Sequence, residues 1–307
     1  MGLAILLAAG FLVFWATLVG LTLRALLYPP RRTFAWSVSR GQPADPGALS
    51  PPRAFEALML RDPARPRETL PYWVIRGDDP AGPVTIFSHG WGESRQSVLQ
   101  RVGALAPVCS RIVAWDMPGH GESGPGPCRL GVEEHRPLIA LAEQFAGSAV
   151  VLHGFSLGAG VSIAAAAAGA PVAAVIAEAP YRLPSTPARC VMRFRGLPYR
   201  LNLGPAMMLA GAVLGAGPLW RRFDRAKLAP RVQCPLLVLH AVGDEMCPVA
   251  DGREIAAAAP RGRMVEAEGG AHLSMWTDAA SHGRWADAVR LVIGAARETS
   301  SCAQSAG

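Results

Sequence analysis

The stretch from Ala149 to Gly169 places an apolar run, a glycine-flanked serine and an alanine-rich run directly after one another. Its first four residues, AVVL, are apolar and partly β-branched, which predicts a strand buried on both faces. Ser162 to Ala168 predicts a helix, and Gly154-Phe155-Ser156-Leu157-Gly158, a G-x-S-x-G, stands between the two. In this context the motif predicts a sharp turn that exposes the Ser156 hydroxyl, with glycines that let the two backbones pass without Cβ clashes.

A serine hydroxyl is a poor nucleophile until a base takes its proton, and that base needs a carboxylate to orient it. Two residues at the ends of expected strands suit these roles. Asp244 follows the expected strand Pro235 to His240, and His272 follows the expected strand Arg263 to Glu266. The order Ser156, Asp244, His272 is typical of a strand–turn–helix nucleophile in an α/β architecture.

Four other histidines are weaker candidates for the base. His153 is too close to Ser156 along its own strand to approach it from across a site, and His240 falls inside its strand. Both are expected to be core histidines with satisfied hydrogen bonds. His89 and His120 lie in turns at the same sheet edge, where they could shape a pocket.

Three other carboxylates could replace the expected acid. Glu245 and Asp251 follow the same strand, but Asp244 comes at the strand's end and is favoured. Glu178 ends the strand after the nucleophile helix. It is the fallback acid and otherwise a structural partner.

An acyl-transfer reaction also needs N–H donors for the oxyanion of its tetrahedral intermediate. Leu157, directly after the serine, is the first expected donor. The second is the backbone N–H of Trp91 in His89-Gly90-Trp91-Gly92, because this glycine-containing loop follows the expected strand Val84 to Ser88.

The order of expected elements predicts the fold class. Ala54 to Leu60 and Leu70 to Ile75 predict an antiparallel strand pair at a sheet edge. From Val84 onward strands and helices alternate, which predicts an α/β fold with a mostly parallel sheet covered on both faces. The further expected strands are Arg111 to Trp115 and Val172 to Ala177, and the expected helices are Ser94 to Leu105, Glu133 to Phe145, Asp251 to Ala259 and Trp285 to Ala296.

The N-terminus carries a long uncharged run, Gly2 to Leu23. Its 22 residues are enough to cross the roughly 30 Å hydrocarbon core as a helix. A cleaved signal peptide is the competing interpretation, but no basic n-region or convincing cleavage site is present. Arg24, Arg31 and Arg32 follow the run, which predicts a single-pass membrane anchor with the rest of the chain in the cytoplasm.

These observations divide the chain into parts. Residues 1–28 are the expected anchor, which contributes no strand or catalytic group, and the Pro- and Gly-rich residues 29–52 are a linker lying over the surface. Residues 53–298 form the expected catalytic domain, followed by a disordered tail, 299–307.

Between two expected strands, residues 181–231 form an insert with nine arginines, one lysine and a single acid, Asp224. Its middle, Leu201 to Trp220, has no charge, but glycines and prolines interrupt it. A second membrane span there would separate the two halves of the sheet. We therefore expect an apolar cap with an arginine rim that binds apolar acyl groups and faces anionic headgroups. The alternative is that the arginines are only a solvated rim and the apolar run is the cap's own small core.

Composition argues against other classes of function. The formal charge is +7, but Lys227 is the only lysine and the arginines are spread out, so a nucleic-acid surface is not expected. The six cysteines are scattered singly without C-x-x-C, so no metal site is predicted. Gly119 to Gly124 matches G-x-G-x-x-G, but prolines surround it and it opens no helix, so no nucleotide cofactor is predicted.

The motifs together resemble the α/β-hydrolases of the serine aminopeptidase-like group, including the membrane-anchored Bem46-type members, over about residues 54–296. The resemblance rests on the loop 89–92, the run Asp116 to Ser123, the G-x-S-x-G motif, the run Gly243 to Val249, and His272. It implies that Asp244 and His272 complete a triad with Ser156, and that Asp116 to Ser123 is mainly a structural turn.

The expected function is that of a membrane-anchored serine hydrolase. It would cleave a small-molecule or lipid-like ester or thioester through an acyl-enzyme, without metal or organic cofactor. Two alternatives are an amidase or aminopeptidase-like peptidase with the same triad, and a catalytically silent membrane-bound interaction protein on the same fold.

Overall fold

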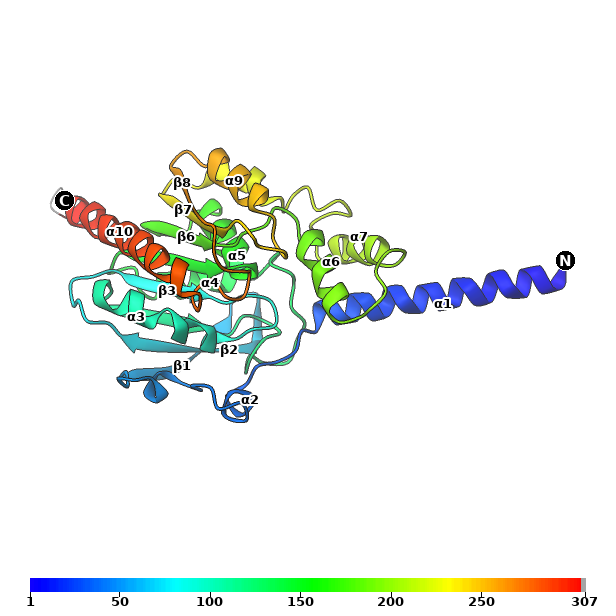
Figure 1. Cartoon of the computed structure of the whole chain (residues 1–307), viewed down its shortest axis with the longest axis horizontal. Coiled ribbons are helices and arrows are strands. Elements are labelled where there is room, and N and C mark those ends of the chain that lie inside the picture. Colours follow the sequence, from blue (N-terminus) through cyan, green and yellow to red (C-terminus); the bar gives the residue numbers. More distant parts are fainter. Residues whose placement is uncertain (305–307) are drawn as a thin grey trace.

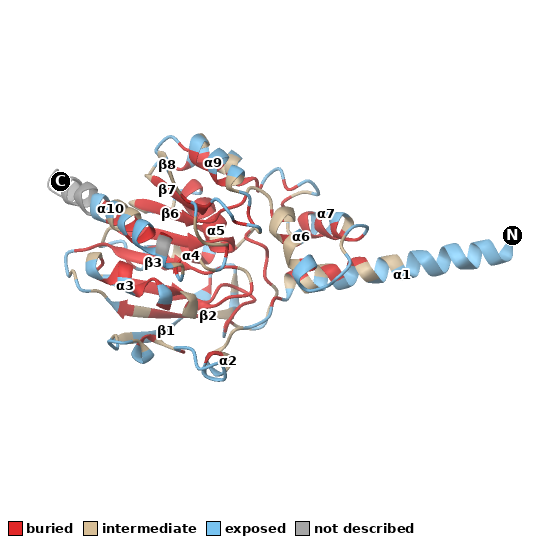
Figure 2. Ribbon diagram, in the orientation of Figure 1, coloured by how far each residue is buried: buried red, intermediate tan, exposed pale blue. Residues whose placement is uncertain are grey.

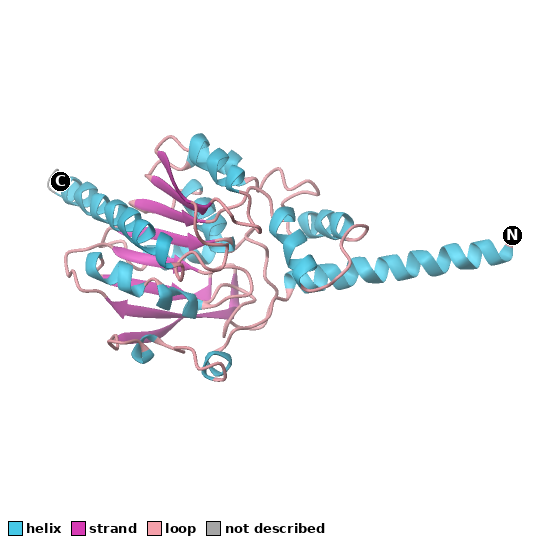
Figure 3. Cartoon of the chain, viewed as in Figure 1, coloured by secondary structure: helices cyan, strands magenta, loops and turns pink. Residues whose placement is uncertain are grey.

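The chain is organised around one eight-stranded sheet, shown by the computed structural model, which describes residues 1–304 (Figures 1 and 3). The strand order across the sheet is β1-β2-β4-β3-β5-β6-β7-β8. The strands are β1 (Phe55–Asp62), β2 (Arg65–Arg76), β3 (Val84–Ser88), β4 (Arg111–Trp115), β5 (Val150–Phe155), β6 (Ala174–Glu178), β7 (Leu236–Ala241) and β8 (Gly262–Ala267).

The sheet is antiparallel at one edge and parallel elsewhere. β2 runs antiparallel to both β1 and β4, whereas every pair from β4 to β8 is parallel. In the register of the central strands, Ser88 lies opposite Gly154 and Phe155 lies opposite Glu178. The carboxyl ends of β3, β5 and β6 therefore meet at one edge, directly beside Ser156.

Helices cover both faces of the sheet, as the alternating pattern predicts. One face packs against α4 (His135–Glu143), α5 (Leu157–Ala167) and α9 (Val249–Ala258). The other packs against α3 (Val102–Leu105) and α10 (Ala279–Gln304). The strands β3, β5, β6 and β7 between these layers are buried along their whole length and are mostly apolar, which confirms the predicted fold class.

The expected helix from Ser94 to Leu105 forms only in part. A 3₁₀ segment spans Arg95–Gln100, and α3 begins at Val102. The backbone N–H and the guanidinium of Arg95 both donate to the carboxylate of Asp116, each at 2.7 Å. These two bonds to Asp116 fix the position of Arg95 and of the turn that it begins. The segment therefore forms a 3₁₀ turn in place of a continuous α-helix.

The insert is a small helical cap beside the carboxyl edge of the sheet (Figure 1). It contains α6 (Ser185–Phe194), α7 (Leu203–Val213) and α8 (Arg225–Leu228). α7 holds the uncharged middle of the insert and has 11 residues, about half of what a membrane span needs. Within the described part of the chain, only α1 (Gly2–Leu27) is long and apolar enough to cross a membrane.

The linker before the sheet and the segment after its last strand both contain helices. The linker carries a short helix, α2 (Phe34–Val38), and lies over the surface, where Ser37 donates to Gln96 at 3.0 Å. At the other end α10 continues through Gln304, beyond the domain boundary expected at residue 298, because no glycine or proline interrupts residues 295–304. The last three positions of the expected tail, 305–307, lie outside the described residues.

Candidate active site

Ser156 stands in a strained turn between β5 and α5. Its backbone has φ 52° and ψ −110°, a region that non-glycine residues rarely adopt. A Cβ at Gly154 would lie 2.2 Å from the carbonyl oxygen of Gly158, and a Cβ at Gly158 would lie 2.0 Å from that of Ser88. The glycines of the motif are therefore required by close backbone contacts, as the sequence predicts.

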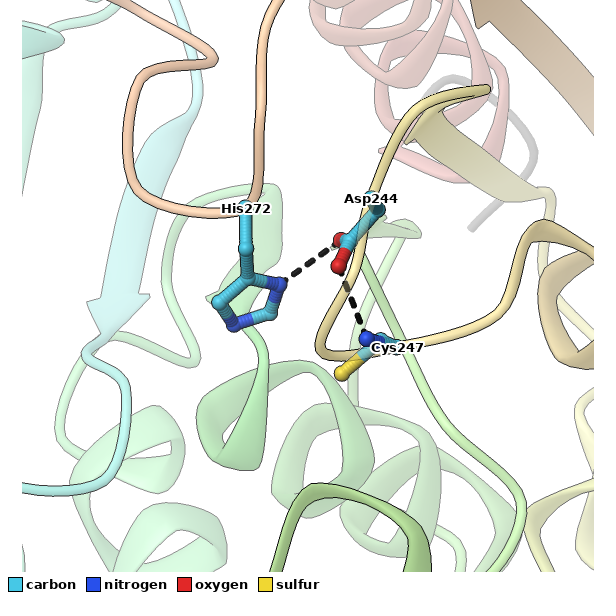
Figure 4. Close-up of side chains that lie close together, drawn as sticks. All are labelled: Asp244, Cys247 and His272. Carbon is cyan, nitrogen blue, oxygen red and sulfur yellow. Dashed lines mark hydrogen bonds and ion pairs between the residues drawn. The ribbon is translucent and has the colours of Figure 1, made fainter. Parts of the chain in front are cut away.

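The structure brings Ser156, His272 and Asp244 into one hydrogen-bonded chain. His272 Nε2 lies 3.1 Å from Ser156 Oγ, and His272 Nδ1 lies 2.7 Å from Asp244 Oδ2 (Figure 4 shows the histidine and the aspartate). The other carboxylate oxygen, Oδ1, accepts from the backbone N–H groups of Met246, at 2.8 Å, and Cys247, at 2.7 Å. This second pair of bonds holds the carboxylate in the orientation that the imidazole needs.

The rival histidines have other partners. His153 Nε2 contacts the carboxylate of Glu178 in the core, and His240 Nε2 donates to the backbone oxygen of Cys247 at 2.9 Å. His89 Nε2 accepts from the backbone N–H of Met117 at 3.0 Å, so the ring proton is on Nδ1. Nδ1 donates this proton to the backbone oxygen of Gly90 at 2.8 Å. Burial, then the nearby His120, hold the pKa of His89 well below its usual range, so its neutral ring fixes this loop.

The rival carboxylates also have other roles. Asp251 accepts from the backbone N–H of Arg182 at 3.0 Å and ties the cap to α9. Glu245 lines the cavity described below but has no hydrogen bond to His272 among the described residues. Glu178 belongs to a buried ion pair on the sheet.

The expected oxyanion donors, Leu157 and Trp91, belong to two segments that meet beside Ser156. Leu157 is the first residue of α5, so its N–H has no acceptor within the helix. Gly158 donates to the backbone oxygen of His89 at 3.1 Å, which fastens the loop containing Trp91 to the start of the same helix. Leu157 and Trp91 both line the cavity into which Ser156 opens.

Cys247 is a close neighbour that the sequence did not single out. Side-chain atoms of Asp244, Cys247 and His272 lie within 4.8 Å of one another, a spacing that would suit a metal ion (Figure 4). The facing atoms of the aspartate and histidine, however, bind each other. Burial and the Asp244 charge raise the pKa of the Cys247 thiol well above its usual value, so it stays protonated, whereas metal ligation needs a thiolate. The donor set therefore fits a triad better than a metal centre.

A cavity of about 380 Å³ opens beside Ser156. Its volume falls in the range of small-molecule sites. The apolar part of its wall comes from the cap, the loop 89–92 and other loops at this edge of the sheet. These residues are Trp91, Leu130, Tyr181, Pro184, Pro187, Ala188, Val191, Phe194, Met246 and Leu273. Charged side chains, including Arg32, Glu93 and Arg195, also line it.

The last turn of α1 is part of this cavity. Leu26 lines it, and the indole N–H of Trp91 donates to the backbone oxygen of Leu26 at 3.0 Å. The next carbonyl oxygen, that of Leu27, accepts from the backbone N–H of Cys128 at 2.8 Å. Residues 1–28 contain no strand, but they do supply a wall of the cavity, which the sequence did not indicate.

A buried ion pair lies at the end of β6, next to Ser156. The guanidinium of Arg101 binds both carboxylate oxygens of Glu178, and Trp276 Nε1 donates to the same group at 2.8 Å. Burial alone would raise the pKa of Glu178, but Arg101 and His153 lower it to about 2. The carboxylate is therefore ionised and structural, the second of the two roles considered for Glu178.

Comparison with known proteins identifies the family. The sequence profile of the alpha/beta hydrolase family matches residues 85–288, which include all three residues of the hydrogen-bonded chain. The chain therefore belongs to the alpha/beta hydrolase family. This match does not extend to the serine aminopeptidase-like and Bem46-type subgroup that the motifs resemble. No curated protein matches the sequence.

Solved structures share the fold at low sequence identity. An esterase of Pyrococcus furiosus matches with a TM-score of 0.66 and 19% identity over 87% of this chain and 97% of its own. A thermophilic esterase from Thermogutta terrifontis matches with 0.58 and 20% over 79% of this chain and 99% of its own. The enol-lactonase from Burkholderia xenovorans matches with 0.57 and 19% over 77% of this chain and 99% of its own.

The Glu178 pair generates a prediction about stability. Glu178→Gln leaves the Arg101 charge buried without a counter-charge, so the free energy of unfolding at neutral pH should fall by about 3–5 kcal/mol. Because the folded pKa of Glu178 is lowered, its contribution is complete above the unfolded value of about 4.3 and is lost as pH falls towards about 2. Urea unfolding between pH 7 and pH 2 measures both effects.

A matched control is Glu143→Gln, at the exposed end of α4. This variant should follow the natural protein at every pH. If Glu178→Gln lost as much stability between pH 4 and pH 2 as the natural protein, the assignment of the acid-sensitive group would be wrong.

Proposed function

We propose that this member of the alpha/beta hydrolase family is a serine hydrolase that cleaves carboxylic esters or thioesters of apolar acyl groups. The observation that carries the proposal is the hydrogen-bonded chain from Ser156 Oγ through His272 to Asp244, opening into a largely apolar cavity. Each of the three side chains is held by a separate strand end, so their relative positions are set by the sheet. Such preorganisation is what a general base and its nucleophile require.

In the acylation step, His272 Nε2 takes the proton of Ser156 as Oγ bonds to the substrate's carbonyl carbon. The carbonyl π electrons move to oxygen, and the N–H groups of Leu157 and Trp91 stabilise this oxyanion. When the intermediate collapses, the bond to the leaving alcohol or thiol breaks and His272 returns the proton to it. The acyl group is then esterified to Ser156.

Deacylation repeats these steps with water. His272 takes a proton from the water molecule, whose oxygen attacks the acyl carbon, and then returns the proton to Ser156 as the acid leaves. Asp244 stays ionised throughout and stabilises the imidazolium in both halves. An amide substrate would pass through the same intermediate, so paired ester and anilide substrates decide between esterase and amidase activity.

We also propose that α1 anchors the enzyme in a membrane with the catalytic domain in the cytoplasm. Its large apolar side chains from Leu3 to Phe14 are exposed, and Arg24 follows within the last turn. The cap adds exposed arginines, each of which gains about 1 kcal/mol near anionic headgroups. These features fit a lipid-like ester as substrate.

The proposed triad predicts a graded loss of activity. Ser156→Ala should abolish both hydrolysis and labelling by a fluorophosphonate probe, because only an activated serine reacts readily. Asp244→Asn should lose less kcat than His272→Ala, although both should lose orders of magnitude. Steady-state hydrolysis and probe labelling of the purified variants measure these effects.

The matched control is Ser162→Ala on α5, where the hydroxyl is buried and has no hydrogen-bond partner among the described residues. It should keep full labelling, and thermal unfolding should show that all variants are folded. More than a trace of activity in Ser156→Ala would show that another group is the nucleophile.

The cavity predicts a dependence on acyl-chain length. Each methylene buried there gains roughly 0.8 kcal/mol, so kcat/KM should rise about fourfold per carbon until the cavity is filled. Val191→Trp on α6 narrows the cavity and should move the optimum to shorter chains, whereas Val38→Trp, on exposed α2, should not. A flat profile across p-nitrophenyl esters of increasing length would refute the acyl pocket.

The anchor predicts an orientation. The two ends of the described chain lie at opposite ends of the molecule (Figure 1), so a reporter fused to the C-terminus stays clear of the membrane. We expect that reporter to be active in the cytoplasm, and the mass of the purified protein to include residues 2–27. An external reporter would contradict the orientation, and loss of the N-terminal mass would indicate a cleaved signal peptide.

A further inference from the structure

The helix α1 has two parts with different surroundings (Figure 2). From Gly2 to Phe14 it is exposed on all sides. From Trp15 onward it packs against the cap: Trp15 Nε1 donates to the backbone oxygen of Leu201 at 3.0 Å, and Thr22 accepts from the side-chain amide of Asn202.

The free part is too short to cross a bilayer. Its 13 residues rise about 20 Å, whereas the hydrocarbon core is roughly 30 Å thick. A full crossing needs about 20 residues, which extends the span from Gly2 to about Leu21, and tilting the helix increases that number. The part of α1 that packs against the cap must then lie within the bilayer as well.

The cap surface at this level is itself apolar. α7 buries Met207 and Ala210 in the core that it shares with the end of α1, and it turns a different set of side chains outward. The outward set includes Met208, Leu209 and Val213 on α7, with Leu201 and Leu219 at the flanks of the helix, and Leu201 lies beside Trp15 of α1. Helix α7 carries no charged residue.

Exposed arginines border this apolar surface. Arg200 precedes Leu201, while Arg221 and Arg222 follow Leu219 by two and three positions. Arg24 follows Leu21, the last residue that a 20-residue span would include. α7 is apolar on all sides, and arginines at the flanks of its exposed apolar set can extend their guanidinium groups to the headgroups while that set lies among acyl chains.

We propose that the α7 surface, comprising Leu201, Met208, Leu209, Val213 and Leu219, is immersed in the acyl-chain region of the bilayer beside α1. This inference rests on the proposed membrane anchoring and adds how deeply the cap lies in the bilayer. The cavity wall formed by Leu26 and Phe194 then lies at the headgroup boundary. A substrate ester reaches Ser156 from the lipid phase without crossing bulk water.

Photo-crosslinking in the full-length protein tests this depth directly. A benzophenone amino acid is placed in turn at Val213 on α7, at Leu12 in the free part of α1, and at Leu291 on α10. Val213 and Leu291 are similarly exposed, at 72% and 74%, and their helices, α7 and α10, lie on opposite sides of the molecule (Figure 1). Each protein is reconstituted in vesicles of phosphatidylcholine and phosphatidylglycerol, irradiated, and analysed by mass spectrometry.

We expect phospholipid adducts at positions 12 and 213 in comparable yield, with only background at 291. Adducts at 12 without adducts at 213 would overturn the immersion of α7 and leave the anchor standing. A crosslink from 213 to a second copy of the chain would also overturn it, because the surface would then be a contact between copies. Absence of lipid adducts at both positions would overturn the anchor and the immersion together.

Fluorophosphonate labelling of the same samples separates these outcomes from the proposed chemistry. None of the three positions lines the Ser156 cavity, so labelling should equal that of the natural protein. Labelled protein without lipid adducts would therefore refute the membrane inference alone.

Discussion

The backbone hydrogen bond from Ser156 N–H to the carbonyl oxygen of Glu178, 2.8 Å long, is the constraint on which the site depends. This bond holds Ser156 in its strained conformation at the end of β5. The same glutamate carries its carboxylate into the buried pair with Arg101, whose guanidinium stacks over Phe155 at 5.3 Å from the ring centre. Phe155 in turn lies against the ring of His272, with centroids 4.9 Å apart. The Arg101–Glu178 pair is thus connected to Ser156 through the Glu178 backbone and to His272 through the Phe155 ring.

The central part of the fold and the grouping of Ser156, Asp244 and His272 could be predicted because their determinants are local in sequence. The burial of strands on both faces requires continuous apolar runs, and the close approach of Gly158 to Ser88 requires a residue without a side chain. Residues that follow such runs must lie at the carboxyl edge of a parallel sheet. Asp244 and His272 could therefore be chosen from position alone, before any distance was known.

Other features could not be predicted because they depend on contacts between distant segments. Leu26 lines the cavity, whereas Leu12 is exposed. The sequence around them does not distinguish the two positions, because protein and lipid surroundings both favour apolar side chains. The broken helix from Ser94 to Leu105 has a similar cause, because Arg95 is held by Asp116 on another strand end. A helical pattern does not reveal such a partner.

The contacts of α1 also affect the order in which the chain can fold. Trp15 binds Leu201 and Thr22 binds Asn202, so α1 cannot form these contacts until synthesis has reached the cap. Such nonlocal contacts form slowly, and an exposed apolar helix is prone to aggregate in the meantime. Lipid would cover α1 during this interval if it inserts early. The cavity wall at Leu26 and the pairing of His272 with Ser156 would then be completed only after the segments that follow the cap have been made, so a chain whose α1 is still free would not yet hold a complete site.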